Sequence, residues 1–213
     1  MTRVPRIDAV PELLVFRHPR AGVQLPAGSV EPDEAWEAAA EREVREETAL
    51  EGAKLVGKLG ELEILLPETQ AIVRAATNVT GWAWARIPRG LTVDVEPRLG
   101  DASWSYVRYR EFAGAEAPPD RGFEVAGWVP SAALTRRVLR HFFHLHFAGD
   151  SPPGPWEVHA DGHVFRPFWT PLELAGSPLH PRQLPWLEQV YTDLLRSARR
   201  LARPEPKSRA RRK

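Results

Sequence analysis

The stretch from Gly28 to Leu50 constrains this 213-residue chain more than any other part of its sequence. Pro32 and Asp33 precede a run rich in alanine and glutamate, which predicts a helix from Glu34 to about Leu50 with Asp33 as its N-cap. Apolar residues recur along this run at four-residue steps, at Trp36, Ala40 and Val44, and predict a buried stripe. The chain must therefore fold around a helix that is apolar on one side and strongly acidic on another.

The acidic side of this helix has the spacing of a convergent site. Glu46 and Glu47 follow Glu43 by three and four residues, so the three carboxylates share one face. Like charges placed in this way repel one another, and a hard divalent cation such as Mg2+ or Mn2+ removes the repulsion because it favours carboxylate oxygens. Arg42 can hold a carboxylate in place, either that of Glu46 one turn away or that of Glu34 two turns away. A solvated charged face is the alternative for three glutamates alone.

The segment also follows a longer pattern. It reads Gly28, five residues, Glu34, seven residues, Arg42-Glu43-Val44, one residue, Glu46-Glu47, one residue, Ala49-Leu50. This resembles the Nudix hydrolase signature, G-x5-E-x7-R-E-U-x-E-E-x-G-U, where U is an aliphatic residue. The one departure is Ala49, which stands at the second glycine of the signature. Glycine relieves left-handed strain at a helix end, so alanine is expected to cost about 1 kcal/mol or to force a different exit.

The resemblance implies an α/β protein, folded as a Nudix α/β/α sandwich with a mixed sheet. It implies a divalent-metal-dependent hydrolase that cleaves the pyrophosphate linkage of a nucleoside diphosphate linked to another group, as in a nucleoside triphosphate or a nucleotide sugar. Which of these substrates is used stays open. The alternative is a regulatory protein that binds a nucleotide or nucleic acid on a Nudix fold without significant catalysis, but such a protein has no need of the acidic set.

The resemblance also implies residue roles. Glu43, Glu46 and Glu47 bind Mg2+ or Mn2+ and activate water, and which glutamate accepts the proton stays open. A backbone carbonyl near Gly28, here that of Ala27, joins the metal ligands. The catalytic set is completed by Arg42, whereas Gly28 and Glu34 are structural parts of the motif.

Other polar residues are further candidates for the site. Glu157 or Asp161 would add a carboxylate, and Arg17 with Arg20 would contact phosphate because they lie near the loop before the helix. Five histidines invite comparison with a metal site, but they lack a third partner at ligand spacing, so a structural or substrate-contacting role is expected. These histidines are His141, His144, His146, His159 and His163.

Residues 67–134 have a different character from the rest of the chain. Short alternating runs predict strands at 71–75, 91–95 and 104–109, and residues 126–131 close the block. These runs resemble a bacterial Src-homology-3-like barrel, inserted between two parts of a Nudix domain, 8–66 and 135–198. The block would recognise a ligand, cover the active site or make a dimer contact; a stabilising insertion with core aromatics is the alternative.

Composition excludes several classes of protein. With no cysteine, the chain has no disulfide, thiolate zinc site or iron–sulfur cluster. Its net charge of +1 is unlike that of a protein that coats nucleic acid. The tail, residues 199–213, holds eight basic residues and one glutamate, which leaves −6 for the remainder. A solvated tail is expected, although it leaves nucleic acid open as a partner.

The partners and location expected from the sequence are those of a small soluble enzyme. The apolar runs near the N-terminus are too short for a signal peptide or a membrane span. We therefore expect a cytoplasmic protein that acts on a small nucleotide and has no membrane partner. A homodimer stays open.

Overall fold

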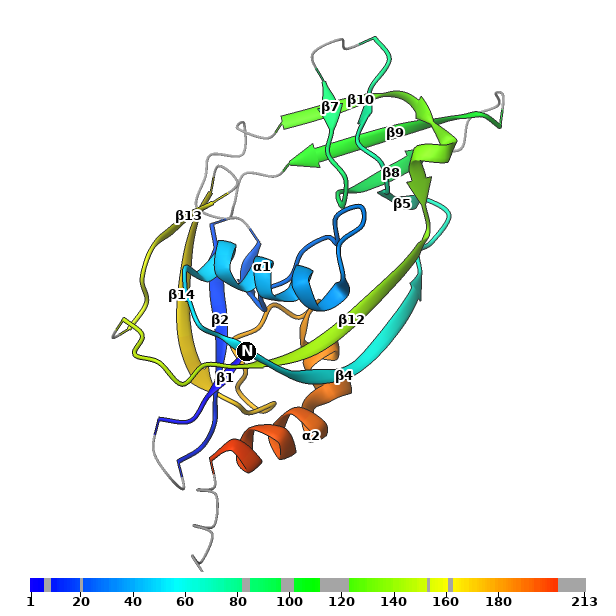
Figure 1. Cartoon of the computed structure of the whole chain (residues 1–213). Coiled ribbons are helices and arrows are strands. Elements are labelled where there is room, and N and C mark those ends of the chain that lie inside the picture. Colours follow the sequence, from blue (N-terminus) through cyan, green and yellow to red (C-terminus); the bar gives the residue numbers. More distant parts are fainter. Residues whose placement is uncertain are drawn as a thin grey trace, which may run out of the picture. The chain divides into compact units, whose positions relative to one another are not determined.

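A computed structural model of the chain describes residues 1–5, 9–19, 21–81, 85–96, 102–111, 123–152, 154–160 and 163–202 (Figure 1). The chain divides into two compact units. The first consists of Met1–Ala27, Ala40–Gly60 and Phe142–Lys213, and the second of Gly28–Ala39 and Glu61–His141. Each unit has an apolar core of its own.

The elements fall into three groups by unit. The first unit holds β1 (Thr2–Arg3), β2 (Glu12–His18), β3 (Gly22–Gln24), β13 (Val158–Ala160), β14 (His163–Pro171) and α2 (Leu184–Leu201). The second holds β5 (Gln70–Val73), β6 (Thr77–Asn78), β7 (Arg86–Ile87), β8 (Thr92–Glu96), β9 (Trp104–Glu111), β10 (Phe123–Pro130), a 3-10 turn (Ser131–Ala133) and β11 (Leu134–Thr135). Three elements have residues in both units: α1 (Trp36–Thr48), β4 (Lys54–Leu65) and β12 (Arg137–His146).

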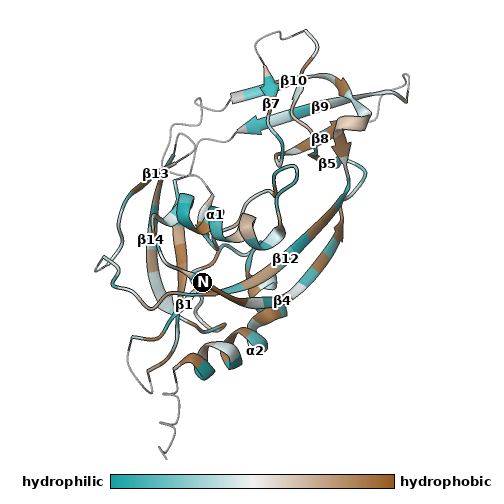
Figure 2. Cartoon of the chain, in the orientation of Figure 1, coloured by the Kyte–Doolittle hydropathy of each residue, from teal (hydrophilic) through white to brown (hydrophobic). Residues whose placement is uncertain are grey.

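The larger sheet has seven strands and a mixed pattern of pairing. Its order is β13-β14-β2-β1-β12-β4, and β3 pairs with β2. The β1–β12 pair is parallel, with Thr2 opposite His146, whereas β14 runs antiparallel to β2, with Phe168 opposite Val15. At the end of the order, β4 alternates between polar and apolar residues (Figure 2), which is typical of a strand with one covered face. The mixed α/β class predicted from the sequence is confirmed.

The residues of β2 determine the layers of the first unit. Leu13 and Val15 share a buried cluster with Leu187 of α2. Leu14 belongs to a different cluster, with Val44 of α1. Because successive side chains of a strand point to opposite faces, α1 and α2 cover opposite faces of the sheet. Each such side chain contributes roughly 1.5–3 kcal/mol on full burial, so β2 anchors both helices.

The second unit contains an antiparallel sheet of five strands, in the order β10-β9-β8-β5-β11. The strands predicted at 71–75, 91–95 and 104–109 correspond to β5, β8 and β9, and the closing segment 126–131 overlaps β10. Within the described ranges, the pairing begins at β10 and ends at β11 without closing. The described part is therefore an open sheet, and a closed Src-homology-3-like barrel stays a prediction.

Gly127 of β10 lies at a close approach of two backbone segments. A Cβ at this position would come within 2.5 Å of Val79 Cγ1 and 2.7 Å of the Thr80 carbonyl oxygen. The Thr80 N–H donates to the Trp128 carbonyl at 3.0 Å, which draws the two segments together. Glycine at 127 is thus required by packing.

The start of α1 differs from the prediction. The helix begins at Trp36, and Asp33 adopts a φ of 64° instead of capping it. The Glu34 N–H donates to the Glu31 carbonyl, and the Glu34 carboxylate accepts from the Glu31 N–H. A closed turn therefore occupies the positions assigned to the cap, and the carbonyl of Ala35 accepts the first helical bond, from Ala39.

The predicted apolar stripe of α1 is correct for two of its three residues. Val44 is buried and Ala40 packs against the same cluster. Trp36, by contrast, is 43% exposed, and its ring lies 3.9 Å from that of His141, centroid to centroid. Within the second unit, the Trp36 ring thus makes a tilted contact, at an interplanar angle of 39°, with the largely buried imidazole of His141.

The end of α1 keeps the left-handed exit that the Nudix signature gives to glycine. Ala49 has a φ of 54°, and its N–H donates to the Arg45 carbonyl at 2.8 Å. An L-residue in this region carries a strain of roughly 1–2 kcal/mol. The alanine has therefore retained the geometry and pays for it in stability.

Ala49→Gly is accordingly expected to raise the free energy of unfolding by about 1 kcal/mol, since glycine adopts this φ without strain. Urea denaturation measures the change. Ala38→Gly, on the exposed side of the same helix, is the control and is expected to lower stability by about 1 kcal/mol. A loss of stability in both variants would contradict the strain at Ala49.

His144 is a buried polar residue that ties three elements of the first unit together. It is 1% exposed, and its ring nitrogens lie 2.7 Å from Thr2 Oγ1 of β1 and 2.8 Å from Ser197 Oγ of α2. Burial above all, and then the charges of the amino terminus and His146, lower the pKa of His144 to about 4. The imidazole is a structural group, as expected for the histidines in general.

Stability is expected to fall with acid over a defined window because of this group. Between pH 6.5, the ordinary pKa of histidine, and about pH 4, His144 is protonated in the unfolded chain but stays neutral in the folded protein. The free energy of unfolding therefore falls by up to about 1 kcal/mol per pH unit as the pH is lowered through this range. It does not change with this group above pH 6.5, and the decrease is complete below pH 4. Unfolding free energies of wild type and His144→Gln across this range measure it. Equal slopes in the two proteins would contradict the prediction.

Candidate active site

The first unit joins the loop before α1 to the acidic face of that helix. The backbone N–H of Ala27 donates to Glu47 Oε2 at 3.0 Å. This bond fixes one oxygen of the carboxylate beside the Ala27 peptide. The contact is made through the amide, whereas the expected metal contact of Ala27 is through its carbonyl, which stays a prediction.

Arg42 connects the two other glutamates. Its Nη1 donates to Glu43 Oε1 at 2.7 Å and to Glu46 Oε2 at 3.1 Å. The Glu43 side chain is only 15% exposed and that of Glu46 is 50% exposed. Of the two partners expected for Arg42, Glu46 is the one it contacts within this unit, and Glu43 is an additional one. The guanidinium offsets the repulsion that three carboxylates create on one helix face.

The carboxylates of Glu43, Glu46 and Glu47 are suitable ligands for a hard cation. In this structure, however, Glu43 and Glu46 are held by Arg42. In the part of the chain that the structure describes, no group of three or more His, Asp or Glu side chains is arranged to hold a metal ion. Arg42 occupies an oxygen of Glu43 and one of Glu46, and the Ala27 amide occupies one of Glu47. Carboxylate oxygens are nevertheless the ligands that Mg2+ and Mn2+ prefer, so the donor set fits such an ion in kind.

Two members of the motif, Gly28 and Glu34, belong to the second unit. Glu34 Oε2 accepts a bond from the Glu31 N–H at 2.9 Å, which fastens the turn before α1. This is a structural role of the kind that the resemblance implies for Glu34.

Of the further candidates, the structure describes Glu157 and Arg17, and their role at the site stays a prediction. Glu157 pairs with Arg166, whose Nη2 lies 2.9 Å from Glu157 Oε1, and both side chains are more than half exposed. Arg17 is exposed on β2, where its backbone lies opposite Val23 and Arg166. Asp161 and Arg20 lie outside the described residues.

A match to a protein family identifies the chain. The family model described as the NUDIX domain matches residues 8–142, which is more than half of the chain. The chain belongs to the Nudix family. The matched range includes the helix that carries Glu43, Glu46 and Glu47 as well as residues 67–134. Membership implies a hydrolase that acts on pyrophosphate bonds of nucleoside diphosphate derivatives, in a family that generally uses divalent metal ions.

The other comparisons add no relative. No curated protein and no solved structure gives a match to the chain. Neither of the described α-helices combines the length and the apolar character that crossing a membrane requires.

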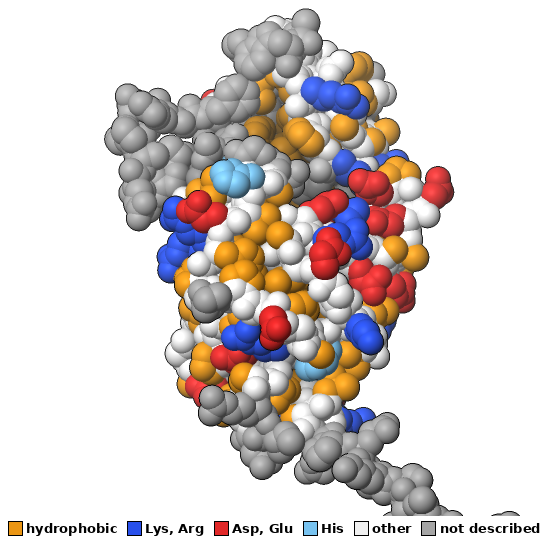
Figure 3. All heavy atoms as spheres, turned by 60° about the vertical axis from the view of Figure 1, so that its left-hand side comes forward, with side chains coloured by type: hydrophobic (Ala, Val, Ile, Leu, Met, Phe, Trp, Pro, Cys, Tyr) orange, Lys and Arg blue, Asp and Glu red, His pale blue; other side chains and the backbone are white. Residues whose placement is uncertain are grey.

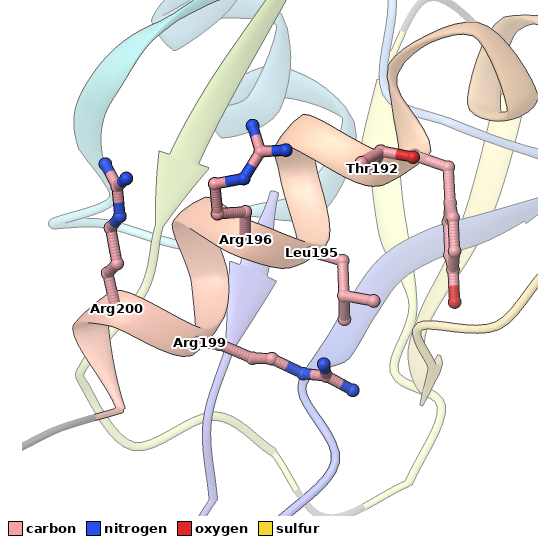
Figure 4. A pocket seen from close by; sticks show the side chains of 6 residues that line it. Thr192, Leu195, Arg196, Arg199 and Arg200 are labelled. Atoms are coloured by element: carbon pink, nitrogen blue, oxygen red, sulfur yellow. The ribbon is translucent and has the colours of Figure 1, made fainter.

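One pocket of this Nudix protein, on α2, is absent from the sites predicted from the sequence (Figure 4). It is lined by Tyr191, Thr192, Leu195, Arg196, Arg199 and Arg200. The helix continues to Leu201, so Arg199 and Arg200, which the sequence analysis assigned to the basic tail, are helical. The recurrence of arginine at three- and four-residue spacing was the signal that could have found this pocket.

Replacing Arg42 should expose the repulsion it offsets. We expect Arg42→Ala to lower the unfolding free energy by about 0.5–1 kcal/mol, because Glu43 and Glu46 lose a shared cation. Arg45→Ala is the control on the same helix: its contact with Glu51 is long, 3.7 Å, and both side chains are more than half exposed. Denaturant melts that show equal losses for the two variants would contradict a special role for Arg42.

Proposed function

We propose that this Nudix protein is an Mg2+- or Mn2+-dependent hydrolase that cleaves the pyrophosphate linkage of a nucleoside diphosphate linked to another group. The observation that carries the proposal is the anchoring of the acidic face of α1: Glu47 is bound to the Ala27 amide, and Glu43 and Glu46 share Arg42. A helix that merely faces solvent does not require its carboxylates to be held in this way.

Each residue of the acidic face has a separate role in this proposal. Glu43 and Glu47 would hold the ion, and Glu46, the more exposed member of the Arg42 pairings, would be a third ligand or would accept the proton from the attacking water. A bound divalent ion supplies an activated water and neutralises charge on the phosphate oxygens. Arg42 is a positioning residue, since it restrains both Glu43 and Glu46. The Ala27 amide orients Glu47, and the Ala27 carbonyl oxygen would be a further ligand of the same ion.

For the second unit we propose that residues 67–134 form an inserted Src-homology-3-like module. Its antiparallel sheet and a separate cluster of nine buried residues support this proposal. The cluster includes Val93, Val107 and Val129, which are among the largest fully buried side chains. A unit that buries its own apolar residues can be added to an enzyme without contributing to its core.

The proposed activity is tested with a panel of nucleoside triphosphates, nucleotide sugars, ADP-ribose and dinucleoside polyphosphates. Release of phosphate, pyrophosphate or nucleoside monophosphate should require Mg2+ or Mn2+. Glu47→Gln should lower the rate at least about 100-fold, since the carboxylate charge is lost with little change in shape. Glu37→Gln is the matched control, on an exposed position of the same helix, and should retain full activity.

Two results would contradict the proposal. Equal rates for wild type and Glu47→Gln would remove the catalytic role of the acidic face. Tight binding of a nucleotide with no metal-dependent turnover on any member of the panel would favour the regulatory binding protein instead.

A further inference from the structure

The pocket on α2 lies on the solvent side of its helix, and the core lies on the opposite side. The buried residues of α2 are Leu187, Val190, Leu194 and Ala198. At about 100° per residue, Thr192 and Arg199 project roughly opposite to these residues. The structure shows Thr192 and all three arginines of the pocket exposed. The polar part of the pocket is therefore exposed, whereas its half-buried lining residues Tyr191 and Leu195 also pack against the core cluster.

The charge of this pocket has one sign. Arg196, Arg199 and Arg200 extend from the C-terminal half of α2 (Figure 4). Asp193 forms an ion pair with Arg196, but the residues that line the pocket include no acid. On the face drawn in Figure 3, by contrast, acidic and basic side chains lie next to one another. Cations near a helix C-terminus gain about 0.3–1 kcal/mol from the helix dipole, and like charges three or four residues apart lose a similar amount. An anionic ligand would relieve the repulsion that remains.

The wider sequence strengthens this field. Residues 199–213 contain eight basic residues and one glutamate, whereas residues 1–198 carry a net charge of −6. Positive charge is thus concentrated at one end of an otherwise acidic chain. A polyanion would be attracted to that end, and the attraction would weaken with salt.

The chemistry of the pocket favours phosphates joined to bases. Arginine presents a planar fork that binds phosphate through two parallel hydrogen bonds. Tyr191 adds an aromatic ring, which is held because its hydroxyl donates to the Leu172 carbonyl at 3.4 Å, and Leu195 adds apolar surface. Nucleic-acid bases stack on such rings. An anionic membrane fits less well, because the apolar side of α2 is already packed in the core and is not free to insert.

We propose that this arginine pocket binds the phosphate backbone of single-stranded nucleic acid. It is a second site, since α1 with its carboxylates and α2 cover opposite faces of the sheet in the first unit. Binding at this site does not require hydrolysis, so it can be tested independently of the proposed enzymatic activity.

The test is fluorescence anisotropy of a labelled 20-nucleotide oligo-uridine titrated with the full chain at several salt concentrations. We expect the triple variant Arg196→Ala, Arg199→Ala, Arg200→Ala to bind at least about tenfold more weakly. Its plot of log affinity against log salt should be shallower by about 2, which is the expectation for three lost contacts to single-stranded phosphates.

A second triple variant controls for net charge. Arg86→Ala, Arg137→Ala and Arg166→Ala remove the same charge from exposed positions of β7, β12 and β14. We expect less than a twofold change in affinity for this variant. Thermal melts of both variants establish that each remains folded.

Several outcomes would overturn the proposal. They are an absence of RNA binding by wild type at 50 mM salt, an equal loss of affinity in the two triple variants, and tighter binding to phosphatidylserine vesicles than to RNA. No binding by wild type would show that single-stranded nucleic acid is not a ligand. An equal loss in the two triple variants would show that net charge alone determines the affinity, and tighter binding to vesicles would identify a membrane surface as the ligand. A selective loss in the α2 variant, with unchanged salt dependence in the control, would support the pocket.

Discussion

The structure of the first unit depends on how β2 is buried. Neighbouring side chains of this strand belong to different clusters, Leu13 and Val15 to that of α2 and Leu14 to that of α1. All three are at most 2% exposed. A strand covered on both faces cannot shift its register by one residue without exchanging the two sets of contacts. The position of α1, and with it the direction in which its glutamates point, is therefore set by an apolar strand that takes no part in the proposed chemistry.

Electrostatics adds a second constraint, on α1 itself. In a helix with Glu43, Glu46 and Glu47 on one face, the carboxylates repel one another, and cations or hydrogen-bond donors offset this repulsion. In this protein the donors include the Arg42 guanidinium and the Ala27 amide. Both come from within the signature segment or next to it, so the motif supplies the acids together with the groups that restrain them. The geometry of the motif is also kept at Ala49, where the helix ends in a left-handed conformation that is unfavourable for alanine.

Much of this was predictable from sequence, because local patterns determine it. Helical spacing placed Arg42 beside Glu46, and alternation found three strands of the second unit. The errors arose where backbone hydrogen bonds competed with propensity. Asp33 is a good N-cap by composition, but the turn between Glu31 and Glu34 displaced the helix start to Trp36.

Features that depend on contacts between different elements were beyond the sequence. The pairing of Glu157 with Arg166 joins residues next to or within neighbouring strands, and the burial of His144 joins β1, β12 and α2. Neither follows from the spacing of residues along one element. The arginines of α2 were visible in the sequence, but only the buried positions of the helix show that they share its solvent side.

The division into units has a consequence for cutting this protein into parts. Neither unit is one continuous stretch: the second takes Gly28–Ala39 as well as Glu61–His141, and α1, β4 and β12 each contribute to both. A gene fragment beginning at Glu61 would lack the earlier piece and would sever β4. The chain passes between the two units more than once, so cleavage of one peptide bond by a protease would leave the units covalently joined. Such interleaving favours inheritance of the two units as one block, because recombination at any one point would divide elements that both require.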